Sequence, residues 1–191
     1  MFDRVLAITN RRLCPIDFLT QLERIAAAHP AGIVLREKDL PESDYMQLAE
    51  QAMEICAKYG IPCILHHFSD IAIQLGCKNL HLPLPDLLTN PEITQQVAMV
   101  GASVHSVQEA QIACKNGAAY LTAGHVFPTD CKAGLAPRGL DFLREVCASV
   151  PIPVYALGGI SPQNASDCLQ AGAAGVAIMS GAMRALNDWV L

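Results

Sequence analysis

The sequence predicts an α/β fold in which eight parallel strands, each followed by a helix, close into a single (β/α)8 TIM barrel. Short apolar and β-branched runs recur roughly every 24 residues, which is a compact βα unit. Segments with apolar residues at helical spacing lie between these runs. Strands that are apolar on both faces belong in a parallel sheet covered by helices, so the alternation indicates α/β.

The expected strands are short and evenly distributed along the chain. They cover residues 5–9, 32–36, 62–66, 79–82, 97–102, 120–124, 153–157 and 175–179. The clearest helical patterns surround residues 19–26 and 48–56. The proline-rich stretch 83–91 is the one connection that reads as an irregular loop.

Helix boundaries are marked by local signals. Ser43 precedes an apolar helical pattern, and Ser106 with Glu109 three residues later forms a capping-box pattern. The Ser161-Pro162 pair predicts a helix with proline at its first position. Four glycines stand between a helical run and the next strand, where helices commonly stop: Gly60, Gly76, Gly117 and Gly172.

Closure into a barrel is favoured over an open doubly wound sheet, which is the alternative. Eight strands enclose an interior that side chains just fill, and no GxGxxG follows the first strand. The 191 residues suit one domain covering residues 1–191, and no linker interrupts them. An internal boundary near 83–91 would leave two halves with open parallel edges.

Composition excludes several classes of protein. The chain is 52% hydrophobic and 16% charged, with a net charge of −5, so it is globular and lacks a basic surface for nucleic acid. No apolar stretch approaches the length of a membrane span, and the first residues do not resemble a signal segment. We therefore expect a cytoplasmic protein. Its eight cysteines are dispersed, which favours free thiols; Cys131, beside Lys132, is the one candidate for a reactive thiol.

Two cations follow the second expected strand, in the segment LREKD. Arg36 and Lys38 occupy alternate positions, so both can point toward an anionic substrate at the carboxyl end of a barrel. The alternative is a solvated loop in which they pair with Glu37 and Asp39.

Glycine-rich turns follow the last two expected strands. Gly158-Gly159 precedes Ile160-Ser161-Pro162, and Met179-Ser180-Gly181 follows residue 178. Backbone amides at helix starts bind anions, and the loops after strands seven and eight are the common phosphate site of such barrels. A phosphate monoester is therefore expected, although a glycine pair can also form a turn without a ligand.

Histidines dominate the remaining expected strand ends. His125 leaves the sixth strand directly, in a loop too long for a simple connection, and is the first candidate for proton transfer. Four others lie at or near strand ends: His66, His67, His81 and His105. They could bind a metal only if the barrel brought them together, and helical zinc spacings are absent, so no metal site is expected.

Five motifs in order resemble the thiamine phosphate synthase/TenI superfamily over nearly the whole chain: LREKD, GASVHS, GHVFPTDCKAGLAPRG, ALGGISPQN and AGVAIMSG. The resemblance implies the same barrel fold. Gly124-His125-Val126-Phe127 looks more similar to the thiazole tautomerase branch than to the GPIFPT-like loop of the synthases. This similarity implies a cofactor-free isomerase that aromatises a thiazole carboxylate phosphate, with His125 carrying the proton.

The resemblance also implies a binding set for the small-molecule substrate. It comprises Arg36, Lys38, Ser103, Thr129, Lys132, Gly159, Met179, Ser180 and Gly181. Synthases hold Mg²⁺ and pyrophosphate through acidic residues after strands three and four, where this chain has His66-His67 and Leu84-Pro85-Asp86. Only Asp86 is a carboxylate there, and Mg²⁺ prefers oxygen ligands, so we expect no cofactor.

Two other functions stay open. The retained positions Arg36, Lys38, Ser103 and Lys132 match pyrophosphate-binding positions of the synthases, so a thiamine phosphate synthase is one alternative. A non-catalytic member that binds a thiazole phosphate for regulation is the other. Neither nucleic acid nor a membrane is an expected partner, and assembly into a homo-oligomer is compatible with this interpretation.

Overall fold

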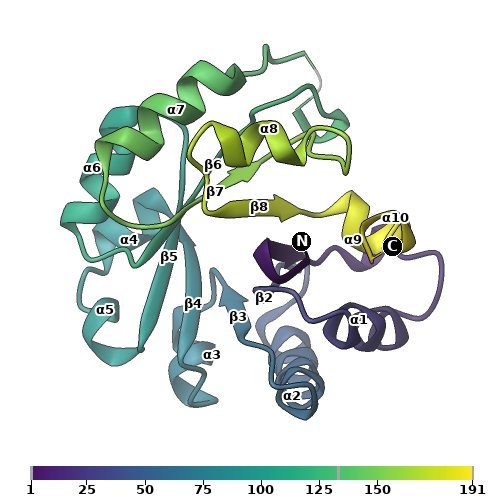
Figure 1. Cartoon of the computed structure of the whole chain (residues 1–191). Coiled ribbons are helices and arrows are strands. Elements are labelled where there is room, and N and C mark those ends of the chain that lie inside the picture. Colours follow the sequence, from purple (N-terminus) through teal and green to yellow (C-terminus); the bar gives the residue numbers. More distant parts are fainter. Residues whose placement is uncertain (1, 133, 191) are drawn as a thin grey trace.

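The computed structural model describes residues 2–132 and 134–190, without the side chains of residues 131 and 190. It contains a closed barrel in which every strand pairs in parallel with the strands next to it in sequence (Figure 1). The strands are β1 (Val5–Ile8), β2 (Gly32–Leu35), β3 (Cys63–His66), β4 (Asn79–Pro83), β5 (Met99–Val104), β6 (Tyr120–Gly124), β7 (Val154–Leu157) and β8 (Gly175–Ile178). The predicted (β/α)8 barrel is confirmed.

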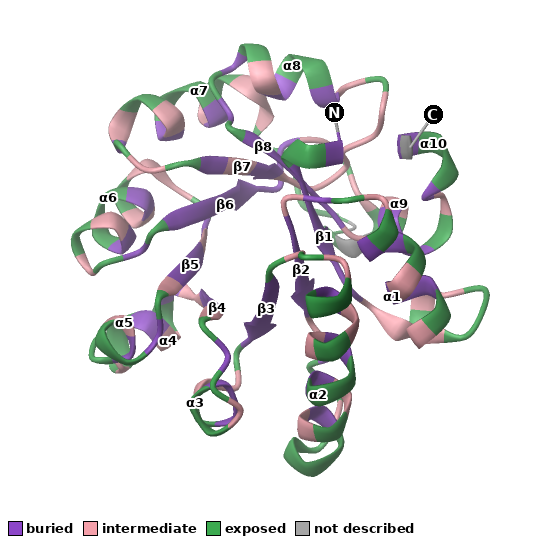
Figure 2. Ribbon diagram, turned by 60° about the horizontal axis from the view of Figure 1, so that its bottom comes forward, coloured by how far each residue is buried: buried purple, intermediate pink, exposed green. Residues whose placement is uncertain are grey.

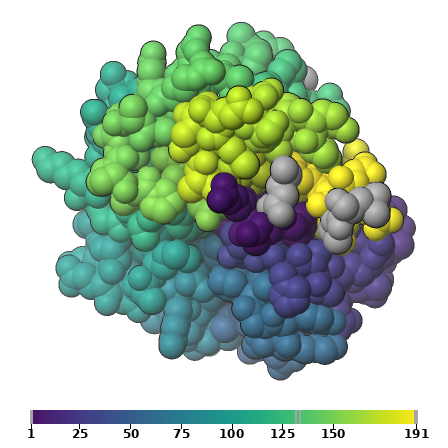
Figure 3. All heavy atoms as spheres, viewed as in Figure 1, coloured from purple at the N-terminus to yellow at the C-terminus, as the bar shows by residue number. Residues whose placement is uncertain are grey.

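Closure occurs between the first and last strands. Leu6 pairs with Ala177 and Ala7 with Ile178, so neither β1 nor β8 is left as an open edge. The two ends of the described chain consequently lie on one side of the molecule, purple beside yellow in Figure 3.

Helices surround the barrel and follow the strands in sequence. They are α1 (Phe18–Ala27), α2 (Glu42–Lys58), α3 (Ser69–Gln74), α4 (Leu84–Thr89), α5 (Ile93–Gln96), α6 (Val107–Lys115), α7 (Gly139–Ser149), α8 (Ala165–Gln170), α9 (Ser180–Arg184) and α10 (Asn187–Val190). In Figure 2 their green outer faces contrast with the purple strands at the centre.

The strands are buried on both faces, as their apolar sequences predict. Alternate residues serve two cores: Val5 and Ala7 pack toward the helices, whereas Leu6 and Ile8 pack inside the barrel. The inner cluster also contains Val34, Ile64, Tyr120 and Ala177. The interior is therefore a packed core that supports a site at one end.

The capping prediction at Ser106 is confirmed, because its side chain accepts a hydrogen bond from the backbone N–H of Glu109 at 3.0 Å. The prediction at Ser161-Pro162 is wrong. Helix α8 begins only at Ala165, because the Asn164 side chain accepts from the Ser161 N–H and donates to the Gly159 carbonyl. This bonding holds residues 161–164 in a turn that precedes the helix.

Three other boundaries differ from the sequence prediction. Helix α2 starts at Glu42, with Pro41 rather than Ser43 at its cap. Residues 84–89, expected in an irregular loop, form helix α4, whose Pro85 lies in the first turn where its missing N–H costs nothing. Strand β5 lies two residues further along than expected, which places Ser103 inside the strand and His105 just beyond its end.

Within the described residues, no helix combines the length and apolar character needed to cross a membrane. The cysteines with described side chains are free thiols, and Cys56, Cys63, Cys77 and Cys168 are buried. The side chain of Cys131, the candidate reactive thiol, lies outside the described part of the structure.

Candidate active site

A pocket opens where the carboxyl ends of the strands meet, and it collects most of the predicted binding residues. Those that line it are Arg36, Ser103, His125, Thr129, Lys132, Gly159, Met179 and Ser180. Lys38 and Gly181 do not line it. The Gly181 position faces Trp189, whose Nε1 would lie 2.6 Å from an added Cβ.

The acidic neighbours of Arg36 and Lys38 are bound to a different cation. Glu37 is buried and accepts hydrogen bonds from the Thr9 hydroxyl at 2.8 Å and the Arg11 guanidinium at 3.0 Å. Asp39 also pairs with Arg11, at 2.7 Å, and this bond lowers the pKa of Asp39 to about 2. The solvated-loop alternative required pairing within LREKD, and the structure shows pairing with the segment after β1 instead.

Arg36 and Lys38 consequently form no ion pair with any residue in 2–132 or 134–190. Lys38 is partly buried, and burial lowers its pKa, as do the charges of Arg36 and Lys132, while Asp86 opposes them. Two cations that line the pocket, Arg36 and Lys132, thus act on a third that lies outside its lining. Such an arrangement is costly without an anion and favours a multiply charged ligand.

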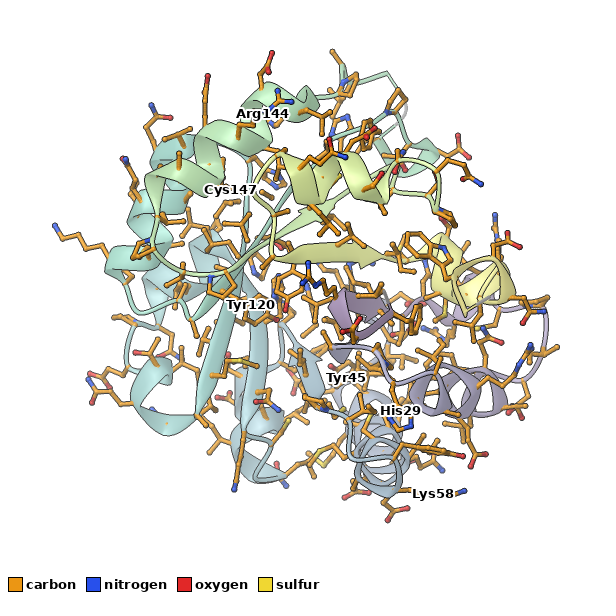
Figure 4. The ribbon with its side chains drawn as sticks, in the orientation of Figure 1. His29, Tyr45, Lys58, Tyr120, Arg144 and Cys147 are labelled. Carbon is orange, nitrogen blue, oxygen red and sulfur yellow. The ribbon has the colours of Figure 1, made fainter. Side chains whose placement is uncertain are left out.

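The Tyr45 side chain links this side of the pocket to helix α2. Its buried hydroxyl donates to the Leu35 carbonyl at 2.7 Å and accepts from the His66 N–H at 3.0 Å. In Figure 4 Tyr45 lies inside the molecule, whereas Lys58 of the same helix extends into solvent. One hydroxyl therefore satisfies the last residues of β2 and β3, immediately before Arg36 and His67.

Tyr45→Phe is expected to reduce the free energy of unfolding by about 1–3 kcal/mol, because it leaves two buried backbone groups without their partner. Urea denaturation measures this change. Tyr59→Phe is the matched control, since the Tyr59 hydroxyl donates to Glu23 near the surface. Equal losses in the two variants would contradict the linking role of Tyr45.

A hydrogen-bonded network forms the floor of the pocket. The two ring nitrogens of His81 lie 2.9 Å from the Tyr120 hydroxyl and 2.8 Å from the Ser103 hydroxyl. Ser103 also contacts the Thr122 hydroxyl at 3.1 Å. Burial lowers the pKa of His81 to about 3, so the ring is neutral, accepts from one neighbour and donates to the other. This network orients Ser103.

His66 lies beside His81 because the two residues are paired in the β3–β4 register. Their rings stack at 5.8 Å between centroids. Burial, followed by the charge of His81, lowers the pKa of His66 to about 2. His66 Nδ1 is buried without a hydrogen-bond partner among the described residues. These two histidines therefore act as neutral ring surfaces in the floor of the pocket.

His125 lies in the pocket wall directly after β6. In the barrel order β6 is four strands away from β2, the strand that Arg36 follows. It is 9% exposed, and its Nε2 lies 3.3 Å from the Leu135 carbonyl. The adjoining His105 places its Nδ1 2.7 Å from the Gly124 carbonyl, bracing the end of β6. His29, by contrast, lies on the surface after α1 (Figure 4).

The glycine pair after β7 permits the closest approach of two loops. Gly159 has a φ of +65°, and an added Cβ would lie 2.7 Å from the Phe127 carbonyl oxygen. Gly158, with a φ of +97°, abuts the backbone of His125. Only glycine fits both the conformation and the space here. The loop after β6 is thereby held against the loop after β7.

Sequence reasoning missed Tyr120 and Thr122 as site residues. Their spacing of two places them on the same face of β6, which is a readable signal once that strand is assigned to a barrel. Arg11 and Tyr45 had no comparable local signal, because their partners are 26 and 21 residues away.

Comparisons with known proteins agree with this geometry. A family model described as thiamine monophosphate synthase matches residues 5–182. The chain belongs to the thiamine monophosphate synthase family. A putative thiamine-phosphate synthase 2 of Aquifex aeolicus is 35% identical over 180 residues, covering 93% of this chain and 96% of that protein. A thiamine-phosphate synthase of Pyrococcus furiosus is 33% identical, covering 95% of this chain and 87% of its own length.

Membership in the thiamine monophosphate synthase family is also seen in three dimensions. The solved structure of thiamine phosphate pyrophosphorylase from Pyrococcus furiosus superposes with a TM-score of 0.86 at 32% identity, covering 98% of this chain and 90% of that one.

The expected tautomerase activity, and with it the isomerase class, is wrong. Relatives that are 30–35% identical over nearly the full chain carry the name thiamine-phosphate synthase, which is a transferase. The expectation rested on His125 within one loop, whereas the similarity to these relatives extends across more than nine-tenths of the chain. The proton-transfer role expected of His125 belonged to the rejected reaction; its position in the pocket wall remains.

Proposed function

We propose that this chain is a thiamine phosphate synthase, joining a pyrimidine diphosphate to a thiazole phosphate. In this reaction the thiazole ring nitrogen forms a bond to the methylene carbon on the pyrimidine. The bond from that carbon to the diphosphate oxygen breaks, and pyrophosphate leaves with the electron pair. The nucleophile is a ring lone pair, so no base is required to activate it.

The observation that carries this proposal is that one pocket is lined by two kinds of candidate anion-binding group. Cationic side chains are the first kind: Arg36 and Lys132 line the pocket, and Lys38, outside the lining, feels the charge of both. The backbone around Gly159 and Ser180, with the Thr129 side chain, supplies the other. A reaction with a diphosphate on one substrate and a phosphate on the other needs two such sets of groups, and the charge developing on the leaving group is stabilised by the cations.

The pocket floor suits the heteroaromatic rings of both substrates. The neutral rings of His66 and His81 provide flat surfaces, and Ser103 is held by His81 where it can bond to a ligand. His125 and Met179 contribute to the wall beside the glycine turns. We assign to these residues the alignment of the two rings for in-line displacement.

The donor set at the β3–β4 edge does not fit Mg²⁺. In the described part of the chain no three histidine, cysteine, aspartate or glutamate side chains are grouped to hold a metal ion. Asp86 supplies a carboxylate there, and its Oδ2 lies 2.7 Å from His67 Nδ1. Mg²⁺ takes oxygen ligands in octahedral geometry, so no step of the proposed reaction is routed through it.

The direct test is to incubate the purified chain with the aminopyrimidine-methyl diphosphate and the thiazole phosphate, and to separate thiamine phosphate by chromatography. We expect thiamine phosphate and pyrophosphate in equal amounts. If no product forms either in the presence or in the absence of Mg²⁺, the synthase assignment is rejected. If the chain then binds the thiazole phosphate to saturation without forming product, it is a binding protein instead.

Arg36→Ala is expected to raise the KM for the diphosphate substrate by about tenfold, with a smaller change in kcat, because it removes one charge from the diphosphate region. The effect should shrink as salt screens the remaining cations. Arg144→Ala is the control, since Arg144 lies on the exposed face of α7 (Figure 4). An unchanged KM at low salt would remove Arg36 from the binding region.

A further inference from the structure

A side-chain pair lies just beyond the carboxyl ends of β3 and β4. His67 Nδ1 lies 2.7 Å from Asp86 Oδ2, and both side chains are partly exposed. His67 has a φ of +73°, which is uncommon for a residue other than glycine. Its N–H bonds to the His81 carbonyl and its carbonyl accepts from Ser69 N–H. These bonds hold the backbone in a conformation that directs the imidazole to Asp86.

Among the described residues, Arg36 and Lys38 form no ion pair with a carboxylate. Arg11 forms ion pairs with both Glu37 and Asp39. The carboxylates nearest in sequence to Arg36 and Lys38 are therefore paired with Arg11. Asp86 is the carboxylate that acts on Lys38, and its own close partner is His67. The pocket can therefore neutralise several negative charges without recruiting a cation from solution.

We propose that this chain binds the diphosphate of its substrate with side-chain cations alone, and that the His67–Asp86 pair occupies the edge at which a divalent cation would otherwise bridge protein and diphosphate. This inference rests on the proposed function, because it concerns the same diphosphate. Asp86 is then a partner for His67 and a negative charge near the anion. It is not a metal ligand.

Titration of the full chain with inorganic pyrophosphate measures this property without any turnover. We expect the Kd in EDTA to agree with the Kd in Mg²⁺ to within about threefold, after correction for pyrophosphate complexed in solution. A larger gain in affinity on adding Mg²⁺ would overturn the proposal.

Asp86→Asn gives opposite results under the two mechanisms. If Asp86 held a metal, the variant would bind pyrophosphate more weakly in Mg²⁺ buffer, which would overturn the proposal. Without a metal, removing a negative charge near the anion leaves the affinity unchanged or up to about threefold tighter. Glu50→Gln is the control, because it removes an exposed carboxylate on α2 outside the pocket lining.

His67→Asp supplies the converse change. With a second carboxylate beside Asp86, binding of pyrophosphate in EDTA is expected to weaken by about tenfold, and Mg²⁺ is expected to restore it. An unchanged affinity of this variant in EDTA would overturn the role given to the His67–Asp86 pair.

The pyrophosphate titrations, read together with the assay for thiamine phosphate, separate this inference from the function on which it rests. If pyrophosphate binds equally well in both buffers and thiamine phosphate never forms, the synthase assignment fails while the metal-free diphosphate region stands. If thiamine phosphate forms but pyrophosphate binds only in Mg²⁺ buffer, the synthase assignment stands and the metal-free binding is overturned.

Discussion

Gly159→Ala is expected to lower kcat/KM for thiamine phosphate formation by about a hundredfold, because a misplacement of about 1 Å in a binding loop costs that much. The added methyl group would meet the Phe127 carbonyl at 2.7 Å, and the φ of +65° disfavours any side chain. Relief requires the loops after β6 and β7 to separate. That movement displaces Thr129 and the proposed phosphate region together.

A control variant distinguishes crowding from backbone strain. Gly139 also has a positive φ, +78°, but nothing lies within 4 Å of an added Cβ. Gly139→Ala therefore carries the strain without the collision, and we expect most of its activity to remain. Steady-state kinetics on both variants, with circular dichroism to confirm folding, make the comparison. Similar losses of kcat/KM would show that contact between the two loops does not matter.

Acid is expected to destabilise the fold steeply, through His66 and His81. Burial lowers the pKa of His66 to about 2 and that of His81 to about 3, against about 6.5 in an unfolded chain. Above a pH of about 6.5 the two histidines are uncharged in both the folded and the unfolded chain, and the free energy of unfolding has its full value. As the pH falls below that, the unfolded chain binds protons that the native state refuses, so the free energy of unfolding decreases by about 5 kcal/mol by pH of about 4.5.

Single histidine variants test this pH dependence. His66→Asn removes one of the two groups and should roughly halve the slope of unfolding free energy against pH between about 6.5 and 4.5. His29→Asn is the matched control, because His29 is exposed and its φ of 53° suits asparagine. The expectation fails if the His66→Asn and wild-type slopes coincide in urea denaturation across this range.

Most of the fold could be predicted because its signals are local. The strands are short runs in which consecutive residues are apolar, and this composition predicts burial on both faces. The Ser106 cap lies three residues from its partner Glu109. The errors were also local in origin. Asn164 competes for the backbone groups that would have begun a helix at Pro162, and Pro85 begins a helix where a proline-rich stretch suggested a loop.

The candidate site was predicted only in outline. Strand-end position indicated Arg36, and the family resemblance added Ser103 and Lys132; all three line one pocket. The sequence did not show which reaction the pocket serves: a resemblance centred on His125 pointed to an isomerase, whereas relatives similar over the whole chain are named synthases. A single loop is weak evidence for a reaction, because the reaction depends on how many groups converge in space.

Taken by itself, the amino-acid sequence determined that eight apolar strands alternate with helices and that cations and glycines follow particular strands. Tertiary structure alone decided the partners of those charges. Arg11 pairs with Glu37 and Asp39, so these carboxylates do not pair with Arg36 and Lys38. His67, after β3, contacts Asp86, after β4. The physical reason is that an ion pair depends on distances of a few ångströms, and the barrel brings together groups separated by 19 to 28 residues.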